Sequence, residues 1–167
     1  MSQILDEIEE CVPALRRYAR ALTHDADHAD DLVQDCLERA IRKRALWKPS
    51  GSLRSWMFRI LLNLYRNDMR RRRHAPDLPL DVLAADPPGP DTQSGRLALA
   101  ETARAMQSLP AEQREVLLLV AVEQMSYAEA AEVLSLPLGT IMSRLGRARA
   151  TLRRLTEAGA PKLRSVK

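Results

Sequence analysis

Ser126-Tyr127-Ala128-Glu129 begins a helix, and Leu136-Pro137-Leu138-Gly139-Thr140 ends it and starts another in a new direction. The first segment is a capping box, in which the serine oxygen accepts a free N–H of the first turn and the glutamate accepts the serine N–H. The proline and glycine of the second segment interrupt one helix and allow the next to begin. This order predicts a helix-turn-helix.

The second helix of this pair has an apolar face and a polar, cationic remainder. Apolar residues recur at helical spacing, namely Ile141, Leu145, Ala148, Leu152 and Leu155. Most other positions carry hydrogen-bonding or basic side chains, namely Thr140, Ser143, Arg144, Arg147, Thr151 and Arg154. Such a helix fits the major groove of DNA, where its first turns meet base edges and its arginines meet phosphates. The alternative is a solvated arginine face on a core helix.

The pattern Ser126-Tyr127-x-Glu129-x-Ala131-x-x-Leu134-x-x-Pro137-x-Gly139-Thr140-Ile141-x-Ser143-Arg144-Leu145-x-Arg147-Ala148-Arg149 is long and free of gaps. It resembles region 4, the promoter-reading C-terminal domain of sigma factors of the extracytoplasmic-function group. The resemblance implies that the −35 element is bound by Tyr127, Thr140, Met142, Ser143, Arg144, Gly146 and Arg147.

Two of these positions depart from the family pattern. Relatives commonly carry a basic or polar residue at Met142 and a bulky one at Gly146. Base readout at position 142 is therefore expected to be apolar, or to shift to Ser143 and Arg147. Glycine at 146 weakens the helix by about 1 kcal/mol relative to alanine, and it allows the backbone to approach DNA closely.

Composition limits the fold and the location of the chain. Lys and Arg (26) exceed Asp and Glu (22) in 167 residues, and the pI near 9.4 suits a polyanionic partner. Aromatic residues make up only 4%, and alternating β-branched runs are nearly absent, so we expect an all-α protein. No stretch approaches the ~20 apolar residues of a membrane span, and the acidic N-terminus lacks a signal-peptide pattern. We therefore expect a cytoplasmic protein without membrane insertion.

The chain divides at a segment rich in proline and aspartate. Residues 74–95 are expected to form an extended, mobile linker, since they combine Pro76, Pro79, Pro87, Pro88 and Pro90 with four aspartates. Before it, residues 1–73 show three helical stripes, the first of which Pro13 is expected to split or kink. After it, residues 96–160 resume helix, with Val116 to Val122 as the buried centre, and 161–167 form a basic tail. The prediction is two small helical domains joined by a flexible linker.

An acidic motif marks the second helix of the first domain. Ala29-Asp30-Asp31-Leu32-Val33-Gln34-Asp35 resembles the most distinctive motif of sigma region 2. The resemblance implies that Asp31, Gln34 and Asp35 dock on the coiled coil of the largest subunit of core RNA polymerase. Carboxylates and an amide suit arginines on a partner helix. The alternative is plain solubility together with helix-start electrostatics.

The third helix of this domain ends in a cluster of arginines. Ser55-Trp56-Met57-x-x-Ile60-x-x-Asn63-x-x-x-Asn67-Asp68-x-x-Arg71-Arg72 is similar to the part of region 2 that opens and reads the −10 element. In the family a flipped base enters a pocket formed by the preceding loop, here Trp47 to Ser52. The resemblance implies −10 DNA contacts from Trp47, Lys48, Ser50, Asn63, Arg66, Arg70 and Arg71. Trp56 fits the apolar stripe and is interpreted as core, whereas Trp47 is expected to be more exposed.

No site for a metal, cofactor or reaction is expected. Cys11 and Cys36 lack a metal-ligand spacing, which favours buried reduced thiols. His24 and His28 could meet on a helix face, but no nearby Cys or His completes a four-ligand set. Phosphate loops and catalytic clusters are also missing, so we do not expect an enzyme.

The resemblance spans nearly the whole chain and implies a sigma factor of the extracytoplasmic-function group. It implies three partners: core RNA polymerase, promoter DNA and an anti-sigma factor. One alternative is a helix-turn-helix transcription regulator, which binds duplex DNA without polymerase and leaves the acidic motif unexplained. The other is a sigma-like decoy for an anti-sigma factor, which would be expected to lose the recognition-helix arginines that are present here.

Overall fold

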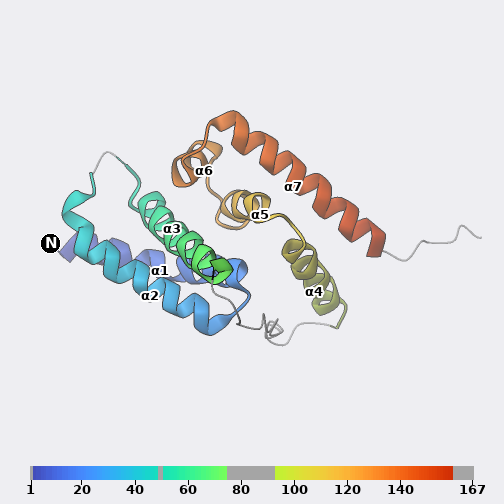
Figure 1. The fold of residues 1–167 in the computed structure, drawn as a ribbon, viewed down its shortest axis with the longest axis horizontal. Helices are drawn as coiled ribbons and strands as arrows, with labels where there is room; N and C mark the ends of the chain where they lie inside the picture. The colour runs from blue at the N-terminus through green and yellow to red at the C-terminus, as the bar shows by residue number, and fades with distance from the viewer. Residues whose placement is uncertain (1, 49–50, 75–92, 160–167) are drawn as a thin grey trace, which may run out of the picture.

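The computed structural model describes residues 2–48, 51–74 and 93–159, and every regular element among them is helical (Figure 1). In chain order these elements are α1 (Ser2–Thr23), α2 (Ala26–Lys43), the 3-10 turn η1 (Arg44–Leu46), α3 (Leu53–His74), α4 (Gln93–Gln107), α5 (Ala111–Leu117), the π-helical turn η2 (Leu118–Val122), α6 (Tyr127–Leu134) and α7 (Leu138–Gly159). The predicted all-α class is confirmed. Among the described residues, none of the helices combines the length and hydropathy that crossing a membrane requires.

Helices α1, α2 and α3 pack together around an apolar core. Asp25 caps the start of α2 by accepting the His28 N–H at 3.0 Å. Residues Leu15, Cys36 and Leu61, one from each helix, are completely buried between them. Tyr18 of α1 meets Phe58 of α3 edge to face, with ring centroids 5.3 Å apart. The three stripes seen in the sequence therefore face one another.

Pro13 was expected to split or kink the first helix, and the expected split is wrong. The helix runs unbroken from Ser2 to Thr23 with Pro13 inside it. Proline removes the N–H that would bond the carbonyl of Glu9, but both residues are exposed. Water can satisfy the unpaired carbonyl at this position, which makes the interruption tolerable.

The C-terminal helices surround α5 and η2. Val116, Ile141 and Ala148 are fully buried at their centre. The predicted burial of 116–122 is confirmed for 116–119. It is wrong for Ala121 and Val122, which are exposed, Val122 at 41%, because the wide turn η2 points its last side chains outward. Leu155 is also 36% exposed, since the end of α7 faces a hollow beside α4.

The helix-turn-helix is present as predicted. Ser126 Oγ accepts the Glu129 N–H at 3.1 Å, and Glu129 Oε2 accepts the Ser126 N–H at 2.7 Å. These hydrogen bonds lower the pKa of the Glu129 carboxyl. Helix α6 ends at Leu134 and is capped by Ser135, whose φ of 55° is left-handed, and α7 begins directly after Pro137.

The ends of the predicted linker are helical. Helix α3 continues through His74, and α4 begins at Gln93 rather than after residue 95. The prediction of an extended, mobile tether falls on 75–92 and the basic tail on 161–167, both outside the described residues.

The two helical groups lie against each other. Helix α6 packs beside α3, and η2 lies near α1, so that one continuous apolar core runs through both groups (Figure 1). This arrangement places the helix-turn-helix directly on the third helix of the N-terminal group.

Candidate nucleic-acid interface

Helix α7 presents an open face opposite its buried stripe. Ile141 and Leu145 are buried against α5 and α6, whereas Met142 is 51% exposed. Ser143, Gly146 and Arg147 are exposed, and a Cβ added at Gly146 would meet no atom within 4 Å. The first three turns of α7 therefore form an uncovered surface with one cation, one hydroxyl, one thioether and one bare stretch of backbone.

Three other residues predicted to bind the −35 element are less exposed to solvent. Arg144 Nη2 lies 3.3 Å from Glu112 Oε2 of α5, and its side chain is 21% exposed. Tyr127 and Thr140 are half-buried. The structure thus groups 142, 143, 146 and 147 on one face and turns Arg144 toward α5.

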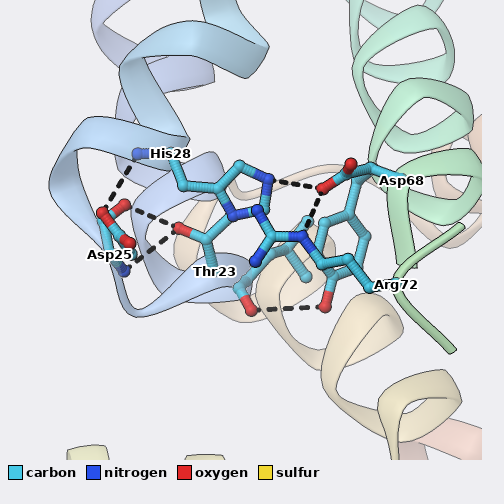
Figure 2. A network of polar contacts seen from close by, with 7 residues as sticks. Thr23, Asp25, His28, Asp68 and Arg72 are labelled. Carbon is cyan, nitrogen blue, oxygen red and sulfur yellow. Dashed lines mark hydrogen bonds and ion pairs between the residues drawn. The ribbon is translucent and has the colours of Figure 1, made fainter. Parts of the chain in front are cut away.

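A polar network holds the basic end of α3 against the α1–α2 junction (Figure 2). Asp68 Oδ2 lies 2.7 Å from His28 Nε2 and 3.0 Å from Arg72 Nε. The Tyr65 hydroxyl donates to the carbonyl oxygen of Leu22 at 3.3 Å on the same side. The helix end is therefore fixed by buried and half-buried groups, while its outer arginines stay at the surface.

The residues predicted to meet −10 DNA fall into two groups. Asn63, Arg70 and Arg71 are exposed along α3. Trp47 and Lys48 line a hollow of about 240 Å³, together with Leu46, Gly51, Ser52, Trp56, Arg59 and Glu132. Ser50 lies outside the described residues.

Both tryptophans are half-buried at this hollow. Trp56 packs against the apolar core, as predicted, but it also lines the cavity. Trp47, which was expected to be the more exposed, is half-buried like Trp56, and its Nε1 is buried with no hydrogen-bond partner among the described residues. The Nε of Arg59 is also buried and unpaired within that part of the chain. Trp47 and Arg59 both line this hollow, and each therefore has one N–H donor with no acceptor among the described residues.

Arg66 is paired rather than free. Its Nη2 donates to Glu115 Oε2 at 2.6 Å and its Nε to Oε1 at 3.2 Å. This hydrogen bonding raises the pKa of the Arg66 guanidinium against the opposing effect of burial. Sequence reasoning missed Glu115 as a partner. Its only signal was a carboxylate at the edge of the apolar run 116–122.

The acidic face of α2 is open, as the sequence predicts. Asp31, Gln34 and Asp35 are exposed, and Gln34 Nε2 reaches Glu38 Oε1 at 3.5 Å. The neighbouring Asp30 instead faces α1, 3.5 Å from Arg16 Nε. Asp31 and Asp35 therefore stand one turn apart on a surface that a partner helix can reach.

The thiols and imidazoles do not form a metal site. Cys11 and Cys36 are buried free thiols, and burial raises the pKa of Cys36 to about 12. His24 lies 3.1 Å from Arg114 Nη1, whereas His28 contacts Asp68. Within the described ranges, no three potential ligands gather as a metal would need.

Comparison with known proteins identifies both halves of the chain. Residues 8–62 match the family described as the Sigma2 domain of PhyR, and residues 99–152 match Sigma-70, region 4. The ECF RNA polymerase sigma factor EcfG of Rhodopseudomonas palustris is 40% identical over 147 residues, which cover 88% of this chain and 81% of the relative. This chain belongs to the extracytoplasmic-function sigma factors. It therefore directs transcription initiation by RNA polymerase, and it is not itself an enzyme.

Other sigma factors are similar to this chain over comparable lengths. CnrH of Cupriavidus metallidurans is 38% identical over 160 residues, covering 89% of this sigma factor and 84% of the relative. The sigma factor RpoE of Bartonella quintana, solved with the anti-sigma factor NepR, has a TM-score of 0.80 at 34% identity and covers 94% and 98% of the two chains. CnrH solved with the cytosolic domain of CnrY has a TM-score of 0.72 at 30% identity, covering 94% and 89%.

Proposed function

We propose that this sigma factor reads promoter DNA with two separate surfaces and binds core RNA polymerase with a third. The open face of α7 is the observation that carries the proposal. The apolar stripe of α7 is buried, and its opposite face is uncovered and polar. A helix held in this way can enter a major groove. The exposed residues of α3 and of α2 supply the other two surfaces.

On the −35 duplex, α7 reads bases partly without hydrogen bonds. The exposed thioether of Met142 suits the methyl group of a thymine. Ser143 offers a hydroxyl to a base edge, and Arg147 offers a guanidinium to guanine or to a phosphate. Gly146 allows the helix to lie closer to the groove floor than a side chain would permit.

On the −10 element, α3 and the preceding loop hold an unpaired strand. Arg70 and Arg71 attract phosphates, and Asn63 offers an amide to a base. Trp47 Nε1 and Arg59 Nε, which have no acceptor among the described residues, favour an acceptor-bearing ligand in the hollow, such as the edge of a flipped base.

On polymerase, the carboxylates of Asp31 and Asp35 bind cations of a helical partner, with Gln34 between them. We expect that partner to be the coiled coil of the largest subunit. Charge-assisted hydrogen bonds at one-turn spacing fix the register of such a contact.

We also propose an anti-sigma factor as a further partner. The support is the similarity to two sigma factors that were solved in complex with anti-sigma proteins, over 94% of this chain in each case. A sigma-like decoy shares that partner without reading DNA, so transcription decides between the two functions.

Run-off transcription with core polymerase tests these surfaces together. The parent protein should create defined start sites that core polymerase alone does not use. Asp31→Ala/Asp35→Ala should abolish them by weakening polymerase capture, whereas the control Glu9→Ala/Glu10→Ala should not, since it removes two exposed carboxylates of α1.

Duplex binding separates the DNA surface from the polymerase surface. Arg147→Ala should weaken binding of the −35 duplex and leave polymerase capture intact, with Arg153→Ala of the same helix as the matched exposed arginine. Undiminished duplex affinity in Arg147→Ala would reject the assignment. Tight duplex binding without any polymerase capture would instead establish an ordinary helix-turn-helix regulator.

A further inference from the structure

The exposed face of α7 has an apolar side and a hydrogen-bonding side. Residues without charge recur at four-residue intervals and form one row along the helix, which we call the apolar row: Leu138, Met142 and Gly146. The neighbouring row, one residue further round, carries the hydroxyl of Ser143 and the guanidinium of Arg147. The helix therefore offers two different kinds of contact to whatever lies against it.

The two side chains of the apolar row are far from the core. Leu138 is 46% exposed and Met142 is 51% exposed, whereas their neighbours Ile141 and Leu145 are 0% and 1% exposed. A single exposed apolar side chain is common on a protein surface, but two at adjacent positions of one helix face indicate a binding surface. Leu138 thus extends the uncovered surface of α7 to the first residue of the helix.

The charges around the apolar row favour a nucleic acid as its partner. Helix α7 contains five arginines, and its one carboxylate, Glu157, lies in the last turn. The first turn, which begins at Leu138, also carries the positive end of the helix dipole. An apolar patch in such surroundings faces a polyanion more favourably than it faces an acceptor of mixed charge.

The major groove presents an apolar group at one kind of base. The C5-methyl group of thymine lies at the base edge, and an aliphatic or thioether side chain can cover it. Cytosine would instead present its amino group, which needs an acceptor. Leu138 has no acceptor and the thioether of Met142 is a weak one, so that amino group would lose its hydrogen bond to water without gaining another. The apolar row therefore selects thymine by attraction and disfavours cytosine by desolvation.

The spacing of the two side chains sets the spacing of the methyl groups. Four residues of α-helix rise about 6 Å, and successive base pairs of B-DNA lie about 3.4 Å apart. Leu138 and Met142 therefore span about two base steps. Gly146 continues the row without a side chain, and a Cβ there would meet no atom within 4 Å. The bare backbone lets the helix come close enough for the two side chains to touch the base edges.

We propose that Leu138 and Met142 each contact a thymine methyl group, so that the −35 element of this sigma factor contains two A·T pairs within three consecutive positions. Ser143 and Arg147 meet the donors and acceptors of the same groove. This inference rests on the −35 surface proposed above. It goes further by naming the bases that the surface selects and by adding Leu138 to the residues that select them.

Selection from random DNA tests the base composition. Core RNA polymerase carrying this sigma factor is mixed with promoter fragments randomised across the −35 region, and the retained fragments are sequenced. The enriched element should contain two A·T pairs within three consecutive positions. An enriched element with fewer than two A·T pairs in such a window overturns the proposal.

Deoxyuridine in the selected fragments isolates the contribution of each methyl group. It pairs as thymine does and keeps every donor and acceptor of the base edge, but it lacks the methyl group. Each replacement should weaken binding by about fourfold, and both together by roughly 15-fold if the two contacts are independent. Equal affinity for the thymine and deoxyuridine fragments overturns the proposal.

Two single variants assign each methyl group to its side chain. Met142→Ala should lose the sensitivity to one replacement and Leu138→Ala to the other, because the contacting side chain is gone. Leu155→Ala is the matched control, since Leu155 is a 36% exposed apolar residue near the other end of α7, and it should keep both sensitivities. Ser143→Ala should bind more weakly and still distinguish thymine from deoxyuridine. Variants at 138 and 142 that keep the full sensitivity overturn the assignment.

The possible outcomes separate this inference from the proposed function. Binding that depends on the −35 sequence but not on the methyl groups rejects the thymine contacts and leaves the −35 surface standing. Binding that does not depend on the −35 sequence at all rejects both. A Leu138→Ala/Met142→Ala protein that binds DNA as the parent does, but no longer retains a protein partner of the parent, would make the apolar row a protein-docking surface and overturn the proposal.

Discussion

Gly146→Ala separates the stability of α7 from its fit to DNA, because the two should change in opposite directions. Gly146 lies in the interior of α7, between Leu145 and Arg147, and it does not have a positive φ. An added Cβ meets nothing within 4 Å, so the methyl group causes no clash in the free protein. The backbone therefore gives no reason for glycine at this position.

The expected gain in stability follows from helix propensity alone. Glycine in a helix interior is about 1 kcal/mol less favourable than alanine, and no steric term offsets the difference here. For a chain of this length a gain of that size raises the melting temperature by roughly 2–4 °C. Ala150→Gly, an exposed position one turn later, is the reciprocal control and should lower the melting temperature by a similar amount.

Duplex binding should worsen in the same Gly146→Ala variant. If the bare backbone at 146 lies close to the groove floor, the added methyl group pushes α7 outward and lengthens the contacts of Ser143 and Arg147. We expect a loss of duplex affinity of about tenfold, which corresponds to about 1.4 kcal/mol. Fluorescence anisotropy with the −35 duplex measures it. A variant that is more stable and binds DNA as tightly as the parent would refute the close approach, and a less stable variant would refute the helix argument.

Three further predictions concern α3, the end of α1 and the core. Asn63→Ala should reduce the permanganate reactivity of melted −10 bases and leave duplex affinity unchanged; equal effects on both would show a general loss of binding. Burial and the neighbouring Arg114 lower the pKa of His24 below its ordinary 6.5, so protonation opposes folding, and stability present above pH 6.5 is lost as the pH falls through the folded-state pKa. His24→Asn tolerates the left-handed φ of 56° and should flatten the fall in urea-unfolding free energy between pH 7.5 and 5.5; an unchanged slope would place the titration elsewhere. Leu61→Ala, at a fully buried position, should cost about 2–5 kcal/mol, and Leu46→Ala, at a 73% exposed one, within about 0.5 kcal/mol, so similar losses would contradict the core assignment.

Local signals in the sequence were enough to predict the helix-turn-helix. The capping box at Ser126 and Glu129 involves residues three apart, and the Ile141–Leu145 stripe needs only the geometry of one helix. The exposed acidic face of α2 is also local, since Asp31 and Asp35 lie one turn apart on the side away from α1 and α3. Each of these features was therefore predicted from its own segment.

Contacts between distant segments could not be predicted in this way. Arg66 and Glu115 are 49 residues apart, Arg54 and Glu123 are 69 apart, and no spacing rule connects them. Arg66 consequently looked like a free phosphate contact. The apolar run to Val122 led to a wrong prediction of burial at its end. The π-helical turn η2 changes which side chains face the core, and the apolar pattern alone does not show that turn. The effect of Pro13 depended on solvent exposure, which only the packed helices reveal.

The hollow beside Trp47 can be monitored by the intrinsic tryptophan fluorescence of this protein. The chain contains two tryptophans, Trp47 and Trp56, and both line that one cavity. Indole emission excited near its red edge therefore comes from a single site, next to the carboxylate-bearing helix α6. Removal of Glu132 from the cavity, or stacking of a base within it, changes the surroundings of both indoles together. If a promoter base enters this hollow, as proposed, its arrival can be followed in the unlabelled protein, in real time and without a substitution.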